Sequence, residues 1–136
     1  MTTLTDPGTD IGVVRSAFAA LGRGDVAGFA DMFHPEATWN HRNQDRLGGV
    51  HVGRDGIIEF VTQSAQLTGG TLRPVPQVFM SDGQGTVSVV VQVSGTRPDG
   101  RAFDDLQMLL LSVDDSHVRR VDQFVGNPSA VKAFWA

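Results

Sequence analysis

The chain has 136 residues, a formal net charge of −4 at pH 7 and no cysteine. This length fits one domain with an ordinary hydrophobic core. The lack of cysteine excludes disulfides, thiol chemistry and thiolate metal sites. The acidic balance, with a single lysine and scattered arginines, argues against a nucleic-acid-binding surface. No apolar run approaches the roughly 20 residues of a membrane span, so no membrane partner is expected.

The first ten residues, MTTLTDPGTD, lack the basic region and the apolar core of a signal peptide. We interpret residues 1–9 as a disordered leader and residues 10–136 as a single domain. A cytoplasmic location is the expectation that follows.

The first third of the domain has helical patterns. Apolar residues recur at helical spacing from Ile11 to Leu21, with Asp10 as a candidate N-cap. Asp25 can cap a second, short helix. That helix ends near Pro35, because proline disfavours helix at the residue before it.

A short strand is predicted over residues 37–41, followed by the polar loop RNQDR. The loop is either a lid held by contacts of Asp45 with Arg42 or Arg46, or a mobile surface loop, which we favour. Residues 53–67 then form a third helix, which the following glycine pair ends.

The second half favours strands. Four segments rich in β-branched or bulky apolar residues are separated by the turn signals DGQG, RPDG and DDS, which predict antiparallel neighbours. Asn127 and Pro128 suit the start of a last helix. The order α-α-β-α-β-β-β-β-α predicts an α+β fold with helices covering one face of a curved sheet.

This order, with particular residues, resembles the SnoaL-like polyketide cyclases and ketosteroid-isomerase-like proteins of the nuclear transport factor 2-like superfamily. The resemblance rests on FHPEATW (33–39), GGVHVGRDGIIEFV (48–61), LTGGT (67–71) and AVKAFW (130–135). It extends over nearly the whole chain. The resemblance implies a cone-shaped fold, in which a strongly curved mixed or antiparallel sheet wraps around the helices and encloses a pocket. It also implies a homodimer through the open sheet face.

Side chains alternate faces along a strand, so the resemblance can be carried to single positions. His41 stands where the isomerases keep the aspartate that acts as general base, and Trp39 shares its face. A histidine can act as a base near neutral pH. The alternative is a histidine that hydrogen-bonds within the loop. Asn40 points away unless a local bulge turns it inward.

Two further carboxylates are candidates for an acid partner. Asp105 and Gln107 share one face of the strand RAFDDLQMLLLSV, and Asp105 is either a buried acid or part of a solvated strand end. The isomerases keep an oxyanion-stabilising acid on this strand, where this chain has Leu109. On the last strand the relatives carry a carboxylate whose place falls on Gln123. Asp122 takes that place if the register is off by one, and otherwise pairs with a nearby arginine.

The predicted function is cofactor-independent acid–base isomerisation or cyclisation of a small, partly hydrophobic or aromatic ligand. His41, Asp122 and Asp105 are the candidate catalytic residues. The candidate ligand-binding residues are Trp39, Asn40, Phe60, Gln107 and Gln123. The four histidines are not spaced as metal ligands, so no metal site is predicted. The alternative is a non-catalytic binding or structural protein that kept the pocket and lost the chemistry.

Overall fold

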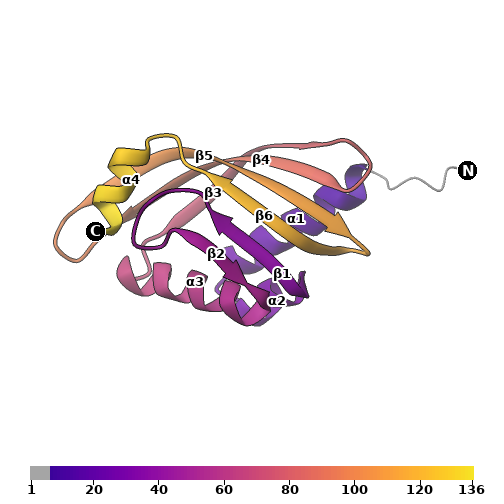
Figure 1. The fold of residues 1–136 in the computed structure, drawn as a ribbon, viewed down its shortest axis with the longest axis horizontal. Coiled ribbons are helices and arrows are strands. Elements are labelled where there is room, and N and C mark those ends of the chain that lie inside the picture. Colours follow the sequence, from indigo (N-terminus) through magenta and orange to yellow (C-terminus); the bar gives the residue numbers. More distant parts are fainter. Residues whose placement is uncertain (1–6) are drawn as a thin grey trace, which may run out of the picture.

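The computed structural model describes residues 7–136, in which four helices and six strands follow one another (Figure 1). The helices are α1 (Pro7–Gly22), α2 (Val26–Asp31), α3 (Gly53–Leu67) and α4 (Pro128–Trp135). The strands are β1 (Phe33–His41), β2 (Gly49–Val52), β3 (Arg73–Ser81), β4 (Thr86–Thr96), β5 (Ala102–Asp114) and β6 (His117–Phe124). Most helices precede the long strands, which confirms the expected α+β organisation.

The strands form one mixed sheet in the order β2-β1-β6-β5-β4-β3. Strand β1 runs parallel to β6, and the other neighbouring pairs are antiparallel. The sheet curls without closing (Figure 1), with α1 packed on β3 and β4 and α3 packed on β1 and β2. Alternate side chains of β4 and β5 are buried against these helices, as strand periodicity requires. The core therefore lies inside the curl, between the sheet and the helices.

Strand β2 was not expected from the sequence, and β1 is longer than the predicted strand over residues 37–41. Strand β2 lies at the sheet edge, where Val50 and Val52 are 57% and 69% exposed. The segment GVHV has only four residues, which is too short for a clear alternating pattern in the sequence. The polar loop is consequently the connection of a hairpin between β1 and β2.

The helix starts follow local capping chemistry. Asp25 caps α2 by accepting the backbone N–H of Gly28 at 2.9 Å, as predicted. Helix α1 begins at Pro7, so Asp10 lies in its first turn and is not the N-cap. The buried Asp10 carboxylate instead accepts the backbone N–H of Gly85, beside β4. Of the expected leader, residues 1–6 lie outside the described residues and residues 7–9 belong to α1.

Helix α4 covers one end of the curled sheet (Figure 1). Asn127 caps it by accepting the Ala130 N–H at 3.2 Å, and Pro128 occupies its first turn, as predicted. The Phe134 ring stacks on Phe103 of β5, with 4.0 Å between ring centroids. Tertiary packing therefore fixes this short helix, which would be unstable alone. Within residues 7–136, no helix is long and apolar enough to cross a membrane.

The turn between β6 and α4 has no room for a side chain at Gly126. The buried Asp105 carboxylate accepts the backbone N–H groups of Gly126 and Asn127, each at 3.0 Å. A Cβ at position 126 would collide with the carbonyl oxygen of Leu106 and crowd Asp105. Position 126 must therefore be glycine for the turn to reach this carboxylate.

We expect Gly126→Ala to lower the free energy of unfolding by about 2 kcal/mol, because the turn must move away from Asp105. Chemical denaturation measures this change. Gly12→Ala is the control, because a Cβ there meets nothing within 4 Å and the position lies in helix α1. Alanine there should leave stability unchanged or raise it by about 0.5 kcal/mol. Equal losses in both variants would contradict the steric argument.

Candidate functional site

A cavity of about 470 Å³ lies between the inner face of the sheet and helices α1 and α3. Much of its wall is apolar or aromatic and includes Phe18, Leu21, Trp39, Leu47, Phe60, Val61, Leu72, Val91, Val93, Phe103, Leu109 and Trp135. His41, Gln107 and Gln123 add polar groups at one end. A concave apolar space with a few convergent polar groups is typical of small-molecule sites.

Three neighbouring strands bring these polar groups together. In the parallel pair of β1 and β6, His41 lies opposite Gln123. In the antiparallel pair of β5 and β6, Gln123 lies opposite Leu109, and Gln107 shares the face of Leu109 two residues away. The register therefore places Gln123 on the cavity side of β6, and Asp122 on the other side.

His41 forms a buried pair with Asp45 of the following loop. The His41 Nε2 atom lies 2.8 Å from Asp45 Oδ2, and the two side chains are 2% and 0% exposed. Asp45 also accepts the side-chain amide of Asn43 at 2.7 Å and the backbone N–H of Leu47 at 2.8 Å. The loop is thus built around one carboxylate, which fixes the orientation of the His41 ring.

This arrangement corrects the expectation for the polar loop. Asp45 pairs with His41 and not with Arg42 or Arg46, and its burial is incompatible with a mobile surface loop. Arg42 turns to the outer side of the sheet, where its guanidinium lies over the Phe124 ring. The sequence carried no periodic signal for Asp45, because a spacing of four residues implies contact only within a helix. The glycine pair after Leu47, where the chain returns to the sheet, was the one feature of the sequence that indicated a tight loop.

The hydrogen bonds define the charge of His41. Its Nδ1 lies 2.9 Å from Gln123 Oε1, and its Nε2 faces Asp45. An amide oxygen and a carboxylate are both acceptors, so each ring nitrogen must carry a proton. His41 is therefore an imidazolium in this arrangement, and its ring holds no lone pair for a base.

The charge of Asp45 agrees with this assignment. Burial alone would raise the pKa of Asp45, but the hydrogen bond and charge of His41, with further hydrogen bonds from Asn43 and Leu47, outweigh it. The pKa of Asp45 is lowered as a result, which keeps the carboxylate ionised. His41 therefore faces an ionised carboxylate across the 2.8 Å contact.

The hydrogen bonds continue from His41 across the sheet. Gln123 donates its Nε2–H to Gln107 Oε1 at 2.7 Å. Gln107 in turn donates to Asp105 Oδ2 at 3.1 Å. Each link donates in the same direction, from the imidazolium toward the second carboxylate. Both glutamine amides are therefore oriented by charged groups at the two ends of the chain.

Asp105 does not reach the cavity. Its buried carboxylate accepts from Gln107 and from the turn that leads into α4, and it is not part of the cavity wall. This position corrects the prediction that Asp105 is a pocket acid. Since both oxygens are occupied by donors, the group holds the turn and orients Gln107.

Asp122 also lies away from the cavity. Strand alternation turns it to the outer face, where it accepts from Arg120 at 2.9 Å and lies 3.4 Å from Arg42. Burial would raise the pKa of Asp122, but the hydrogen bonds and charges of Arg120 and Arg42 outweigh it and lower the pKa. Asp122 thus pairs with an arginine, as one of the two alternatives expected, and it does not line the cavity.

The remaining candidates divide between the two faces. Trp39 lines the cavity and donates its indole N–H to Gln123 Oε1 at 2.9 Å. Phe60 packs against both Trp39 and His41, with ring centroids 5.6 and 5.9 Å apart. Asn40 faces outward, with its amide 3.5 Å from Asp122. The structure therefore brings Trp39, His41, Phe60, Gln107 and Gln123 together.

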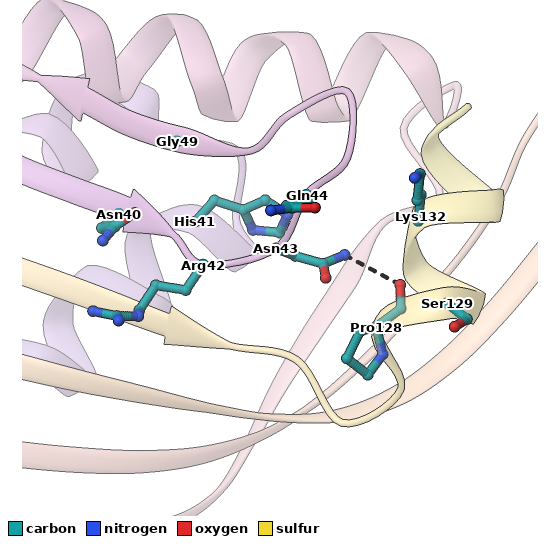
Figure 2. A pocket seen from close by; sticks show the side chains of 9 residues that line it. All are labelled: Asn40, His41, Arg42, Asn43, Gln44, Gly49, Pro128, Ser129 and Lys132. Carbon is teal, nitrogen blue, oxygen red and sulfur yellow. Dashed lines mark hydrogen bonds between the residues drawn. The ribbon is translucent and has the colours of Figure 1, made fainter.

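A second, open groove of about 640 Å³ lies on the outer side of His41 (Figure 2). It is lined by Asn40, His41, Arg42, Asn43, Gln44, Gly49, Pro128, Ser129 and Lys132. Asn43 joins the loop to α4 by donating to the carbonyl of Pro128 at 3.3 Å (Figure 2). His41 is the residue that lines both spaces, so its ring lies in the wall between cavity and groove.

We expect Asp45→Asn to lower the free energy of unfolding by about 3 kcal/mol at pH 7, because it removes one partner of a buried ion pair. The folded-state pKa of Asp45 lies below its ordinary value of 3.8. The ionised form thus stabilises the fold above this ordinary value, and the stabilisation is lost as pH falls through the folded-state pKa. Denaturation at several pH values should show the difference between variant and wild type shrinking in acid.

Asp31→Asn is the control for this series, since Asp31 is an exposed acid at the end of α2. Its substitution should change stability by less than about 0.5 kcal/mol at every pH. A loss in Asp45→Asn that does not vary with pH would mean that shape, and not charge, sets the contribution of Asp45.

Comparison with known proteins gives the family. The model of the SnoaL-like domain matches residues 14–121. The Rv0034 protein of Mycobacterium tuberculosis (strain ATCC 25618 / H37Rv) is 28% identical over 127 residues, which are 93% of this chain and 96% of that protein.

Solved structures show the same fold at low sequence identity. Bal32a, from a soil-derived mobile gene cassette, has a TM-score of 0.92 at 22% identity, over 96% of this chain and 98% of its own. An NTF2-like protein from Burkholderia xenovorans LB400 has a TM-score of 0.83 at 20% identity, over 97% and 99%. TerC, co-crystallized with polyporic acid, has a TM-score of 0.82 at 22% identity, over 93% and 97%. The fold is therefore nuclear transport factor 2-like, and with the match over residues 14–121 the chain belongs to the SnoaL-like domain family.

Proposed function

We propose that the protein binds a small, largely apolar or aromatic molecule in the cavity and acts on it by cofactor-independent acid–base chemistry, of the isomerisation or cyclisation type. The observation that carries the proposal is the buried ion pair of His41 and Asp45 at the polar end of an apolar cavity. Charged pairs in such surroundings are costly to desolvate and are concentrated at functional sites. The co-crystallization of TerC with polyporic acid supports a small organic ligand for this fold.

The charge state gives His41 the role of an acid in the first step. Its Nδ1–H points toward the cavity side, where Gln123 now accepts it. When a ligand oxygen takes that place, an O–H bond can form as the Nδ1–H bond breaks. The neutral ring that remains keeps its Nε2–H on Asp45. Its Nδ1 can then take a proton from the carbon next to the protonated carbonyl, so that the C–H bond breaks, an N–H bond forms and the enol is left. One residue can thus serve as acid and then as base.

A non-catalytic binding protein is the second candidate, and a specific observation favours it. Both nitrogens of His41 are satisfied by protein acceptors. The family resemblance implies a carboxylate at the position of Gln123, which is an amide in this chain. A glutamine can accept and donate hydrogen bonds but cannot abstract a proton. The two candidates agree on the cavity and differ on proton transfer.

Hydrogen exchange into a probe separates the two candidates. We expect the wild type to accelerate deuterium incorporation into the methyl group of 2-acetylnaphthalene in D₂O, by about 100-fold over buffer. His41→Phe should return the rate to that of buffer while the probe still binds, because an apolar ring keeps the wall closed. Mass spectrometry measures the exchange, and calorimetry measures the binding.

His117→Gln is the matched control, since His117 lies at the start of β6 and outside the cavity wall. It should exchange the probe at the wild-type rate. Binding of the probe without exchange above the buffer rate in the wild type would favour the binding protein.

We also propose that a second copy of the chain binds to the outer face of the sheet. Cross-strand neighbours there form an apolar row from Val78 through Val90 and Met108 to Phe124. Met80, Leu106 and Leu110 extend it on the same face, and each is between 38% and 54% exposed. A contiguous apolar patch of this kind marks an interaction surface, and a symmetric dimer would cover it with the same patch.

Light scattering tests the dimer directly. We expect a mass of twice 14.6 kDa for the wild type and a single chain mass for Met108→Lys, because a buried lysine would lose its hydration. Val52→Lys is the control, since Val52 is exposed on β2, away from this patch. A wild type with a single chain mass at all concentrations would refute the proposed dimer.

A further inference from the structure

Two hydrogen-bond donors in the cavity wall converge on one atom. The Nε1 of Trp39 and the Nδ1 of His41 each lie 2.9 Å from the same oxygen, Oε1 of Gln123. An indole nitrogen can only donate, and both nitrogens of the imidazolium donate. The geometry is that of a site for one acceptor oxygen, with both donors at the distance that stabilises a partial negative charge.

The rest of the hydrogen-bond chain determines which end of the Gln123 amide faces the two donors. Its Nε2 donates to Gln107, and Gln107 donates to Asp105. A flip of the Gln123 amide would set its NH₂ group against two other donors. Only the oxygen fits between Trp39 and His41, so an amide oxygen of the protein occupies the acceptor position.

The donors are rigid, whereas the acceptor can move. Trp39 and His41 are 9% and 2% exposed, and Asp45 fixes the His41 ring. Gln123 lies one residue from the end of β6, is partly exposed and lines the cavity. Its flexible side chain can change rotamer without disturbing the sheet. A ligand oxygen could therefore replace the amide oxygen and meet the same two donors.

We propose that Trp39 and His41 form a two-donor site for one ligand oxygen, and that Gln123 occupies this site until the ligand displaces it. The inference rests on the proposed function, because it assumes that the ligand enters the cavity. The ligand class it names is an apolar molecule that presents a carbonyl oxygen at the polar end. An ammonium or amide N–H at that position would meet two donors and be rejected.

The displacement exchanges one acceptor for another at the two donors, and it also breaks the hydrogen bond from Gln123 to Gln107. The affinity for a ligand oxygen therefore depends on how strongly Gln123 binds to the two donors. Removal of the Gln123 oxygen should free the donors and raise the affinity for a carbonyl. A carboxylate at position 123 should have the opposite effect, because a charge-assisted hydrogen bond to the imidazolium is stronger than a neutral one. The two substitutions at position 123 are therefore predicted to change the affinity for a carbonyl ligand in opposite directions.

The experiment compares the binding of 2-acetylnaphthalene with that of 2-isopropenylnaphthalene, which has the same shape and no oxygen acceptor. Calorimetry measures both dissociation constants for each variant. In Gln123→Ala we expect the affinity for the ketone to rise about tenfold more than that for the alkene, which corresponds to one hydrogen bond. In Gln123→Glu the ketone should bind about tenfold more weakly than in the wild type, with the alkene unchanged.

Leu109→Ala is the matched control, because Leu109 lies opposite Gln123 in the sheet and also lines the cavity. It enlarges the cavity without removing an acceptor, so ketone and alkene should change equally. Trp39→Phe added to Gln123→Ala should abolish most of the preference for the ketone. Melting curves of each variant establish that it is folded before binding is measured.

Equal changes for the two probes in Gln123→Ala and Gln123→Glu would overturn the two-donor site while leaving the ligand-binding cavity intact. A ketone preference that survives Trp39→Phe in full would also overturn it, because one of the two donors would then be irrelevant. Failure of both probes to bind the folded wild type would refute the proposed cavity ligand, and the two-donor site with it.

Discussion

The buried contact between His41 and Asp45 determines how the neighbouring polar groups of the site must be arranged. Two opposite charges removed from water are stable only if their remaining hydrogen-bonding groups are satisfied. Here Asn43 and Leu47 supply the further donors for the carboxylate, and Gln123 supplies the further acceptor for the ring. The loop conformation, the ring orientation and the rotamer of Gln123 all follow from this requirement.

The same requirement extends the polar structure across three strands. Because Gln123 must present its oxygen to His41, its nitrogen must face Gln107, and Gln107 must then donate to Asp105. Asp105 also holds the turn at Gly126, which starts the helix that carries Trp135 into the cavity wall. A change of charge at Asp45 would thus affect groups on β1, β6 and β5, through oriented amides and without movement of the strands.

The sequence predicts features of the site that follow from strand periodicity better than those that depend on strand register or loop conformation. Strand alternation placed Gln107 and Leu109 on the inner face correctly, because a long, half-buried strand has a clear period of two. The same rule left Asp122 and Gln123 unresolved, since β6 has register shifts against both neighbours and counting residues cannot locate them. The contact of Asp45 with His41 was not predicted, because it depends on a loop conformation that has no periodic pattern in the sequence. Strand β2 was missed because its four residues are too few for a clear strand period.

The neutral amide of Gln123 beside the His41 ring has an electrostatic consequence. A carboxylate there would place two anions around one imidazolium and neutralise its charge from the cavity side. A neutral amide leaves that charge balanced only by Asp45, which lies on the far side of the ring. The ion pair then acts as a dipole whose positive end faces the apolar cavity, where the low dielectric strengthens its field. A ligand oxygen that gains electron density would be stabilised there.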